Sequence, residues 1–352
     1  MSSLFKAPSL ADLAQRLGLA TSTVSRALAD CRDISEETKV RVRQAAEDLN
    51  YTRNTLAASL RKGRSNMIGI IVPQLEGFFF PAVLNSIEKL ASKAGFTVLI
   101  GQSHEDLGCE RQQVARLLAA QVSAIIIAVA AGTGAQTKHL EQVRQQGVPL
   151  IFFDRLPELA GSHTVVLDDR AGASQAVTHL LAQGCQRIAH LAGPQHLSTH
   201  RNRYIGYCDA LRAHGLPVEE KFVYPLPGIS QQDGRVGMRR LLALDQRPDA
   251  LFTTSGLSAA GAMAELTRQH IQVPSDMAVV CFNNSPFTNL LQPPLTVVDQ
   301  QAEQMGAATI RMFLTLLKPG TSSRPTQVVL PAKLRVRKSS LQLPDAPSTA
   351  LR

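Results

Sequence analysis

Several polar residues of this sequence stand directly after apolar runs or tight turns, where the side chains of an α/β protein can meet a ligand. Arginine donates paired hydrogen bonds to carboxylates and phosphates, whereas carboxylate and amide oxygens accept hydrogen bonds from hydroxyl groups. The pattern therefore predicts a polar binding site, although a local cap or ion pair would also explain the Asp-Arg pair. The residues concerned are Asp154, Arg155, Arg201, Arg203 and Asn283.

Two aromatic residues, Phe79 and Phe80, follow the apolar run at residues 67–72. An aromatic ring can stack on the apolar face of a ligand. The same two residues are equally suited to core packing, so both interpretations stay open.

Two histidines, His196 and His200, are four residues apart, which is one helical turn. Their segment begins in a predicted loop and lacks the glutamate of a His-Glu-x-x-His motif, so we expect no metal site. The sequence also lacks a G-x-S-x-G motif and a G-x4-G-K phosphate loop. An enzyme is therefore disfavoured, and we expect no cofactor.

Polar residues near the amino terminus suit DNA better than a small ligand. Thr21, Ser22 and Arg26 lie on a predicted helix whose other face carries Val24 and Ala27. Arginine matches the O6 and N7 acceptors of guanine in the major groove, and short hydroxyls can pair with several bases. These three residues are candidates for base contacts.

Three short helices are predicted to hold these residues. Ser9 and Asp12 can form a capping box at the first helix, and Gly18 can end it. A third helix begins near Ser35 and runs to Asn50. Two short helices around a glycine-containing turn, braced by a third, match the helix-turn-helix plan, with an ordinary three-helix bundle as the alternative.

A basic segment then joins this head to the rest of the chain. Asn54 can cap a two-turn helix that presents Ala57 and Leu60 on one side. A small and a bulky apolar residue on a basic linker suit insertion into the minor groove.

The body of the chain alternates short apolar runs with amphipathic stretches. Such alternation predicts parallel sheets with helices on both faces, and two half-bodies predict a two-lobed core. The expected strands are 67–72, 96–101, 124–129, 148–154, 164–167, 187–192, 222–225, 250–254 and 277–282, and the expected helices lie near 80–94, 107–120, 135–146, 170–183, 201–214, 230–243 and 257–270.

Charge and composition agree with a basic head on a neutral body. Residues 1–64 hold 11 Lys/Arg against 7 Asp/Glu, and residues 333–352 hold 5 against 1, while the 268 residues between them carry only +1. A basic head suits a polyanion. The five cysteines form no C-x-x-C pair, and neither a signal sequence nor an 18-residue apolar run is found. We therefore expect a cytoplasmic protein with reduced thiols and no membrane contact.

The motifs LADLAQRLGLATSTVSRAL, N-x-x-A-x-x-L, IGIIVPQLEGFFFP and QPPLTVV resemble the LacI/GalR family of transcriptional regulators over residues 9–338. The resemblance implies that the second helix reads the major groove and that Ala57 and Leu60 of a hinge helix reach the minor groove. It also implies phosphate contacts at Ser9, Thr23, Ser35 and Thr38. Thr52-Arg53 stands where the family often has Arg-Pro, so the hinge lacks a fixed φ.

The same resemblance implies an effector site between the lobes. It assigns the effector-binding arginine to Arg203 and places Asp154 and Asn283 at effector positions. Ser255 stands where sugar-binding relatives tend to have Asn, Asn283 where Asp is common, and Ile229 where an aromatic is frequent. Loss of acidic groups makes the cleft less hostile to an anion, which favours an acidic or phosphorylated sugar-like effector, and an eroded effector site would give the same pattern.

We therefore expect an α/β protein with a three-helix helix-turn-helix headpiece (1–52), a hinge helix (53–64), a periplasmic-binding-protein-like core of doubly wound parallel sheets (65–338) and a flexible tail (339–352). The first lobe is expected at about 65–161 and 293–322, and the second at about 162–292 and 323–338. A homodimer would bind a pseudo-palindromic double-stranded operator as a repressor. A transport-type solute receptor shares the two lobes but needs an export signal and no helix-turn-helix.

Overall fold

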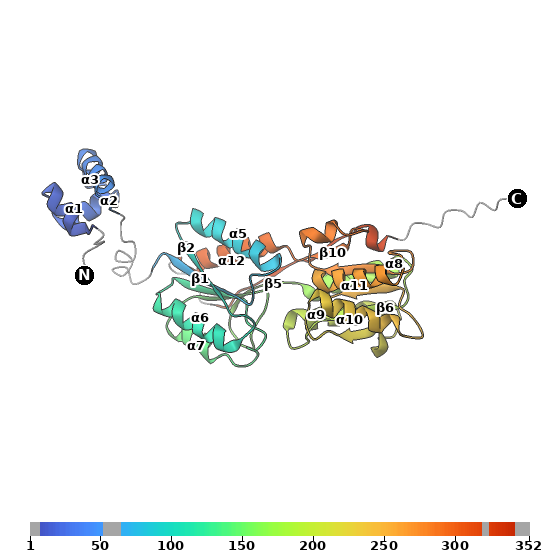
Figure 1. Cartoon of the computed structure of the whole chain (residues 1–352). Coiled ribbons are helices and arrows are strands. Elements are labelled where there is room, and N and C mark those ends of the chain that lie inside the picture. The colour runs from blue at the N-terminus through green and yellow to red at the C-terminus, as the bar shows by residue number, and fades with distance from the viewer. Residues whose placement is uncertain (1–7, 52–64, 319–323, 342–352) are drawn as a thin grey trace, which may run out of the picture. The chain divides into compact units, whose positions relative to one another are not determined.

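The computed structural model describes residues 8–51, 65–318 and 324–341. The chain divides into two compact units, Met1–Ser65 and Asn66–Arg352 (Figure 1). The predicted hinge residues Asn54, Ala57 and Leu60 lie outside the described residues.

Over residues 8–51, the amino-terminal unit forms a bundle of three helices, α1 (Leu10–Leu17), α2 (Thr21–Leu28) and α3 (Glu36–Asp48). Ser9 caps α1 in a capping box with Asp12, and Gly18 ends it at φ 64°, a conformation that glycine adopts without strain. The three helices bury one small core made of Leu13, Ala14, Val24, Ala27, Val42, Ala45 and Ala46.

The first lobe of the second unit contains a six-stranded sheet in the order β11-β5-β4-β3-β1-β2, all of whose neighbouring strands are parallel. One face is covered by α5 and α12 and the other by α6 and α7 (Figure 1). The strands are β1 (Met67–Val72), β2 (Thr97–Gln102), β3 (Ala124–Ile127), β4 (Leu150–Phe153), β5 (His163–Leu167) and β11 (Gln327–Leu330), and the helices are α5 (Phe79–Lys93), α6 (Leu107–Ala119), α7 (Lys138–Gln145) and α12 (Ala302–Leu316).

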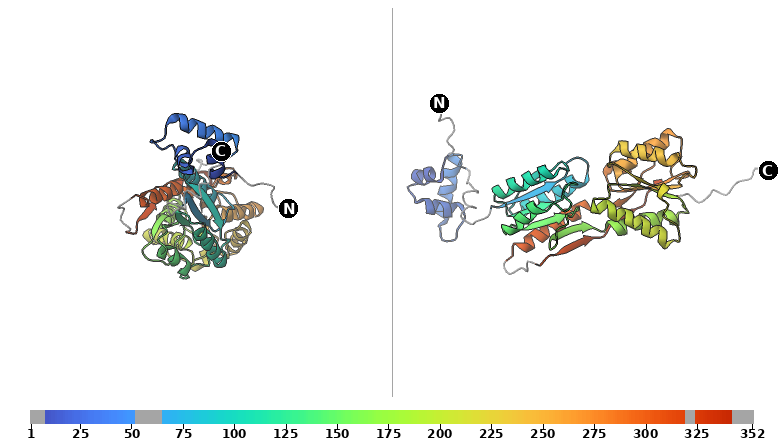
Figure 2. Two further views of the ribbon diagram at one scale, coloured as in Figure 1. Left: turned by 90° about the vertical axis from the view of Figure 1, so that its left-hand side faces the viewer. Right: turned by 90° about the horizontal axis from the view of Figure 1, so that it is seen from below.

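The second lobe repeats this architecture with the strand order β12-β10-β9-β8-β6-β7, in which only the β10–β12 pair is antiparallel. Figure 2 shows the two lobes next to each other, with helices on both faces of each sheet. The strands are β6 (Ile188–Ala192), β7 (Val223–Pro225), β8 (Ala250–Thr253), β9 (Ala278–Phe282), β10 (Thr296–Asp299) and β12 (Lys333–Arg335), and the helices are α8 (Asp169–Ala182), α9 (Ser198–Ala213), α10 (Gln231–Leu242) and α11 (Gly256–Arg268).

The lobe boundaries expected near residues 162, 293 and 323 are each wrong by about one strand. β5 pairs with β4 and β11 in the first sheet, and β10 pairs with β9 in the second. The chain therefore enters the second lobe after Leu167, leaves it after Asp299 and re-enters it between β11 and β12. An apolar pattern identifies a buried strand, but it does not say which sheet the strand joins.

The tail expected to begin at residue 339 begins later. Ser339 and Ser340 are fully buried, and the Ser339 hydroxyl donates to the Val279 carbonyl at 2.6 Å and accepts from the Thr296 amide at 2.8 Å. Ser339 therefore joins β9 to the first residue of β10, so the core continues through Ser340, and residues 342–352 lie outside the described residues.

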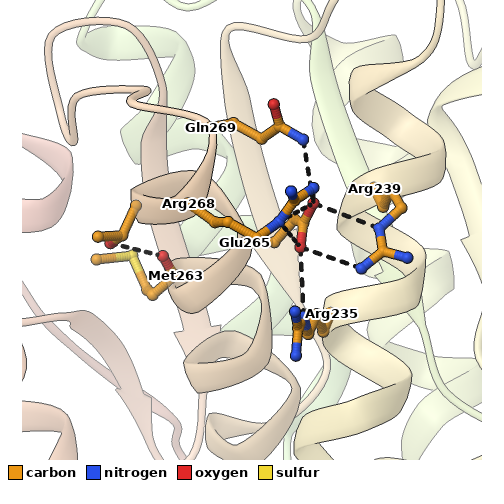
Figure 3. A network of polar contacts seen from close by, with 7 residues as sticks. Arg235, Arg239, Met263, Glu265, Arg268 and Gln269 are labelled. Carbon is orange, nitrogen blue, oxygen red and sulfur yellow. Dashed lines mark hydrogen bonds and ion pairs between the residues drawn. The ribbon is translucent and has the colours of Figure 1, made fainter.

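A buried carboxylate joins α10 to α11. The side chain of Glu265 is fully buried beneath Arg235, Arg239 and Arg268, with its closest contact at 2.5 Å from the Arg268 guanidinium (Figure 3). The hydrogen bond from Arg268 is the main cause that holds the pKa of Glu265 well below its usual range, and hydrogen bonds from Arg239 and Gln269 add to it. This network fixes the two helices to each other.

No helix in the described part of the chain is both long enough and apolar enough to cross a membrane.

Candidate functional site

A cavity of 420 Å³ lies between the two lobes and receives residues from both. The first lobe contributes the loop after β1, the start of α5 and the end of β4, and the second lobe contributes the start of α9 and the segments that follow β8 and β9. The carboxyl ends of the strands face this space, as expected for a ligand site in open α/β sheets. All six residues predicted for the effector site line it: Phe79, Phe80, Asp154, Arg203, Ser255 and Asn283.

Arg203, on the first turns of α9, is already paired. Its Nε and Nη2 atoms both lie 2.8 Å from Oδ1 of Asp169, and its Nη1 donates to the Thr254 carbonyl at 2.9 Å. The guanidinium also lies 3.9 Å from the centre of the Phe282 ring. The sequence predicts an arginine that is free to bind an anion. In the structure, Asp169 occupies the Nε–Nη2 edge of the Arg203 guanidinium, which is the edge that would bind the anion.

Asp154 is a buried carboxylate that faces the cavity, and its ion pair is weak. Its side chain is 8% exposed, and its Oδ2 lies 3.9 Å from Nε of Arg155, beyond hydrogen-bond distance. Arg155 donates instead to both carboxylate oxygens of Glu105, at 2.8 and 2.7 Å. Burial raises the pKa of Asp154, while Arg155 and Arg203 oppose the rise. Among the described residues, no side chain or amide donates a hydrogen bond to Asp154, so it is available to a ligand hydroxyl.

Aromatic rings form the apolar part of the wall. Phe80 packs edge-on against Phe79 and Phe153, at centroid distances of 5.2 and 6.1 Å, and only 5% of it is exposed. Core packing is therefore the main role of Phe80. Phe78 of the first lobe meets Phe287 of the second at 5.9 Å, and both also line the cavity.

Ser255 and Asn283 line the cavity with different freedom. The Ser255 hydroxyl accepts from the Ser258 amide at 3.1 Å as the N-cap of α11 and donates to the Ile229 carbonyl at 3.2 Å. The Asn283 side-chain oxygen accepts from the Ser285 hydroxyl, which leaves its NH₂ group to donate.

Two of the cavity residues other than glycine have left-handed backbones, with φ 59° at Asp154 and 89° at Asn283. Residues other than glycine rarely adopt this region, although Asp and Asn tolerate it best. Each residue directly follows a central strand, β4 or β9, so the unusual conformation turns the chain out of the sheet at the cavity.

Sequence reasoning missed Asp169 as the partner of Arg203, and it missed His200 as a residue that lines the cavity. Asp169 could have been noticed because it follows a predicted strand, as Asp154 does. His200 is 4% exposed, and its Nδ1 lies 2.7 Å from the Thr254 hydroxyl. Burial lowers the pKa of His200 well below its ordinary value, so the ring is neutral at pH 7. The ring is packed against Gly193, where any Cβ would lie 2.7 Å from its carbon and nitrogen atoms.

The charges around the cavity are predominantly negative. Two arginines, Arg155 and Arg203, face five carboxylates that line the cavity or bind those arginines. The five are Asp154, Asp169, Glu105, Glu76 and Asp233. Such a balance opposes an anionic ligand and suits a neutral one with hydroxyl groups.

In the amino-terminal unit, α2 exposes Thr21, Ser22 and Arg26 and buries Val24 and Ala27 on its other side. Residues 22 and 26 are one turn apart and so share a face. The residues predicted to contact phosphates lie at helix starts. Ser9 caps α1 and Ser35 caps α3, with the Ser35 hydroxyl 2.9 Å from that of Thr38, and Thr23 is half-buried in the first turn of α2. Helix amino termini favour phosphate.

Both parts of the chain match known families. Residues 9–54 match the family model "Bacterial regulatory proteins, lacI family", and residues 177–340 match "Periplasmic binding protein-like domain". The chain is 30% identical over 336 residues to the ribose operon repressor of Halalkalibacterium halodurans, covering 94% of this chain and 96% of that protein.

Solved structures agree with these matches. The lac repressor dimer bound to operator and an anti-inducer has a TM-score of 0.87 at 25% identity, covering 96% of this chain and 100% of that one. The transcriptional regulator CelR in complex with cellobiose has a TM-score of 0.71 at 26% identity, covering 94% and 99%. The chain belongs to the LacI family. It is a DNA-binding transcriptional regulator with a helix-turn-helix domain and a periplasmic-binding-protein-like core.

Proposed function

We propose that this chain represses transcription as a cytoplasmic homodimer on a pseudo-palindromic operator, and that a neutral, sugar-like effector in the cavity sets its operator affinity. The effector acts by shifting the equilibrium between two lobe arrangements that differ in DNA affinity, and this action involves no catalysis. Thr21, Ser22 and Arg26 read bases, Ser9, Thr23, Ser35 and Thr38 contact phosphates, and the hinge residues Asn54, Ala57 and Leu60 reach the minor groove.

The observation that carries the neutral effector is the pairing of Arg203 with Asp169 beside Asp154, whose only ion pair among the described residues is a 3.9 Å contact with Arg155. An anion would have to displace Asp169 from Arg203 and approach Asp154, and both steps are unfavourable in a buried site. A sugar hydroxyl can donate to Asp154, and the Phe79 ring can cover its apolar face. The relatives named for a ribose operon and for a cellobiose complex support a sugar-like ligand.

The test is a thermal-shift screen with matched sets, each containing a neutral sugar, its uronic acid and its phosphate. Any hit is then titrated into the protein–operator complex, which shows whether the effector releases or promotes binding. We expect the neutral member to stabilise the protein most. Greater stabilisation by the acid or phosphate would contradict the neutral assignment.

Two variants connect this ligand to the cavity. Asp154→Asn should weaken the neutral ligand by about 10-fold or more, because a buried acceptor for a hydroxyl is lost, while operator affinity without ligand stays unchanged. Glu76→Gln is the matched control, since Glu76 lines the cavity but is exposed. Equal effects of both variants would remove Asp154 from the site.

The assembly is testable separately. A two-fold operator requires a two-fold protein, so light scattering should give a dimer. A stable tetramer would contradict the proposed dimer.

A further inference from the structure

The exposed arginine of α2 is held by a carboxylate from the connection between α2 and α3. The Nη2 atom of Arg26 forms an ion pair with Oδ2 of Asp33. The side chains are 55% and 48% exposed, so the pair is accessible to DNA and the remaining N–H groups of Arg26 stay free to donate.

The backbone fixes Asp33 beside α2. The Cys31 amide donates to the Arg26 carbonyl at 3.1 Å, and the Ile34 amide donates to the Cys31 carbonyl at 3.3 Å. Ile34 packs against the small core of the headpiece. The carboxylate therefore stands next to Arg26 before any DNA is bound.

A neighbouring carboxylate in the same connection has a different task. Asp30 pairs with Lys39 and Arg43 of α3, each at 3.0 Å, and so joins the connection to the third helix. Asp30 thus has a structural role that Asp33 does not share, because Asp33 pairs with a residue on the DNA-reading face.

We infer that Asp33 is a positioning residue for base recognition, which holds the guanidinium of Arg26 in the orientation that meets a guanine. The inference rests on the base-reading role proposed for Arg26. A guanidinium has five N–H groups in one plane, so a carboxylate can take one of them while two others pair with O6 and N7 of guanine. If the plane of the Arg26 guanidinium is fixed before DNA binds, the side chain loses less conformational entropy on binding.

A carboxylate at this place has a second, separable effect. Its charge repels the phosphates of any duplex, whatever the sequence. Asp33 should therefore reduce affinity for random DNA and increase discrimination at one base pair. An exposed ion pair that did not orient Arg26 would reduce affinity for random DNA but would not change discrimination at a base pair. Such a pair would also contribute little to the stability of the fold.

The experiment selects the operator with the full-length protein from a library of duplexes with about 20 randomised base pairs, a length that spans two half-sites. Binding to the selected duplex and to each of its single-base variants is then measured for the wild type, Arg26→Ala, Asp33→Asn and Glu37→Gln. Glu37 is the matched control, because it is an exposed carboxylate in the first turn of α3. A random duplex reports affinity without specificity.

We expect Arg26→Ala to reduce preference at one base pair by about 5- to 100-fold. Asp33→Asn should reduce preference at that same base pair by about 3- to 10-fold while binding random DNA about 2- to 3-fold more tightly. Glu37→Gln should tighten binding to all duplexes alike. In the double variant Arg26→Ala/Asp33→Asn, the loss of preference should equal that of Arg26→Ala alone.

Three results would overturn the inference. If Arg26→Ala reduces the preference but Asp33→Asn behaves like Glu37→Gln, Asp33 acts only through its charge. If Asp33→Asn alters a different base pair, Asp33 reads a base itself. If Arg26→Ala leaves every preference unchanged, the proposed role of Arg26 fails, and the role of Asp33 fails with it.

Discussion

The guanidinium of Arg203 and the carboxylate of Asp169 form a closed ion pair, with Nε 2.8 Å from Oδ1 and both side chains 5% exposed. Asp169 is the first residue of α8, so the pair joins the point where the chain enters the second lobe to α9. Burial raises the pKa of Asp169 to about 6, and Arg203 limits the rise. Arg203, which is proposed to lie at the effector site, is therefore also a structural residue of this lobe.

The first prediction concerns this pair. Arg203→Ala leaves a buried carboxylate without a partner and should lower the free energy of unfolding by about 3–5 kcal/mol. The double variant Arg203→Ala/Asp169→Ala should recover at least about 1 kcal/mol of that loss, because the unpaired charge is gone. Denaturant unfolding of the four proteins of the cycle measures the coupling. Additive losses would show that the two side chains act independently.

The second prediction concerns the left-handed residue Asn283. Asn283→Ala and Asn283→Gly both remove the hydrogen bond to Ser285, but only alanine places a Cβ at φ 89°. Asn283→Ala should therefore be less stable than Asn283→Gly by about 1 kcal/mol. Thermal unfolding compares them, and equal stability would mean that the backbone relaxes out of this conformation.

Local pattern predicted most elements to within a few residues, because the central strands are buried on both faces as continuous apolar runs, while the helices bury one face. β1 at Met67–Val72 and α2 at Thr21–Leu28 illustrate this agreement. The sheet membership of β5 and β10 was not predictable, since pairing depends on contacts far apart in the sequence.

The site shows the same division. Strand ends placed Asp154 and Asn283 at the cavity, because parallel strands end at one edge. The ion-pair partner of Arg203 could not be predicted in this way. Asp169 lies 34 residues from Arg203, and no local pattern connects them. For this reason the sequence alone favoured an anionic ligand, whereas the pairing of Arg203 with Asp169 supports the neutral ligand proposed above.

The third prediction concerns the network of Glu265. Glu265→Gln should lower the free energy of unfolding at pH 7 by about 1–2 kcal/mol, because three arginines lose their common carboxylate. The pKa of Glu265 is lowered in the folded state, so its contribution is present above pH 4.5 and declines as the pH falls below that value. The gap between wild type and variant should shrink accordingly.

Unfolding in urea at pH 7, 5 and 3.5 measures that gap. Asp209→Asn is the control, since Asp209 forms a partly exposed pair with Arg170 and should cost little. A gap that stays constant across this range would show that the variant acts through packing and not through charge.

The last prediction concerns His190, a fully buried histidine in β6. Its ring stacks on Phe252 and Tyr207, at 4.9 and 5.1 Å, and its Nδ1 lies 3.0 Å from the Phe252 carbonyl. In the described part of the chain its Nε2 has no hydrogen-bond partner. Burial lowers the pKa of His190 from 6.5 to about 4, so the unfolded chain takes up a proton there before the folded protein does. Stability must therefore fall as the pH drops from 6.5 towards 4.

His190→Phe keeps an aromatic ring in the stack and removes the titration. Between pH 7 and pH 4.5 the wild type should lose roughly 2–3 kcal/mol more stability than this variant, since each unit of pKa difference corresponds to about 1.4 kcal/mol. All other titrating groups are shared, so the difference between the two stability curves isolates His190. Chemical unfolding across this pH range gives both curves. Parallel curves would show that the imidazole is protonated as easily in the folded protein as in the unfolded chain, which is incompatible with its burial between Phe252 and Tyr207.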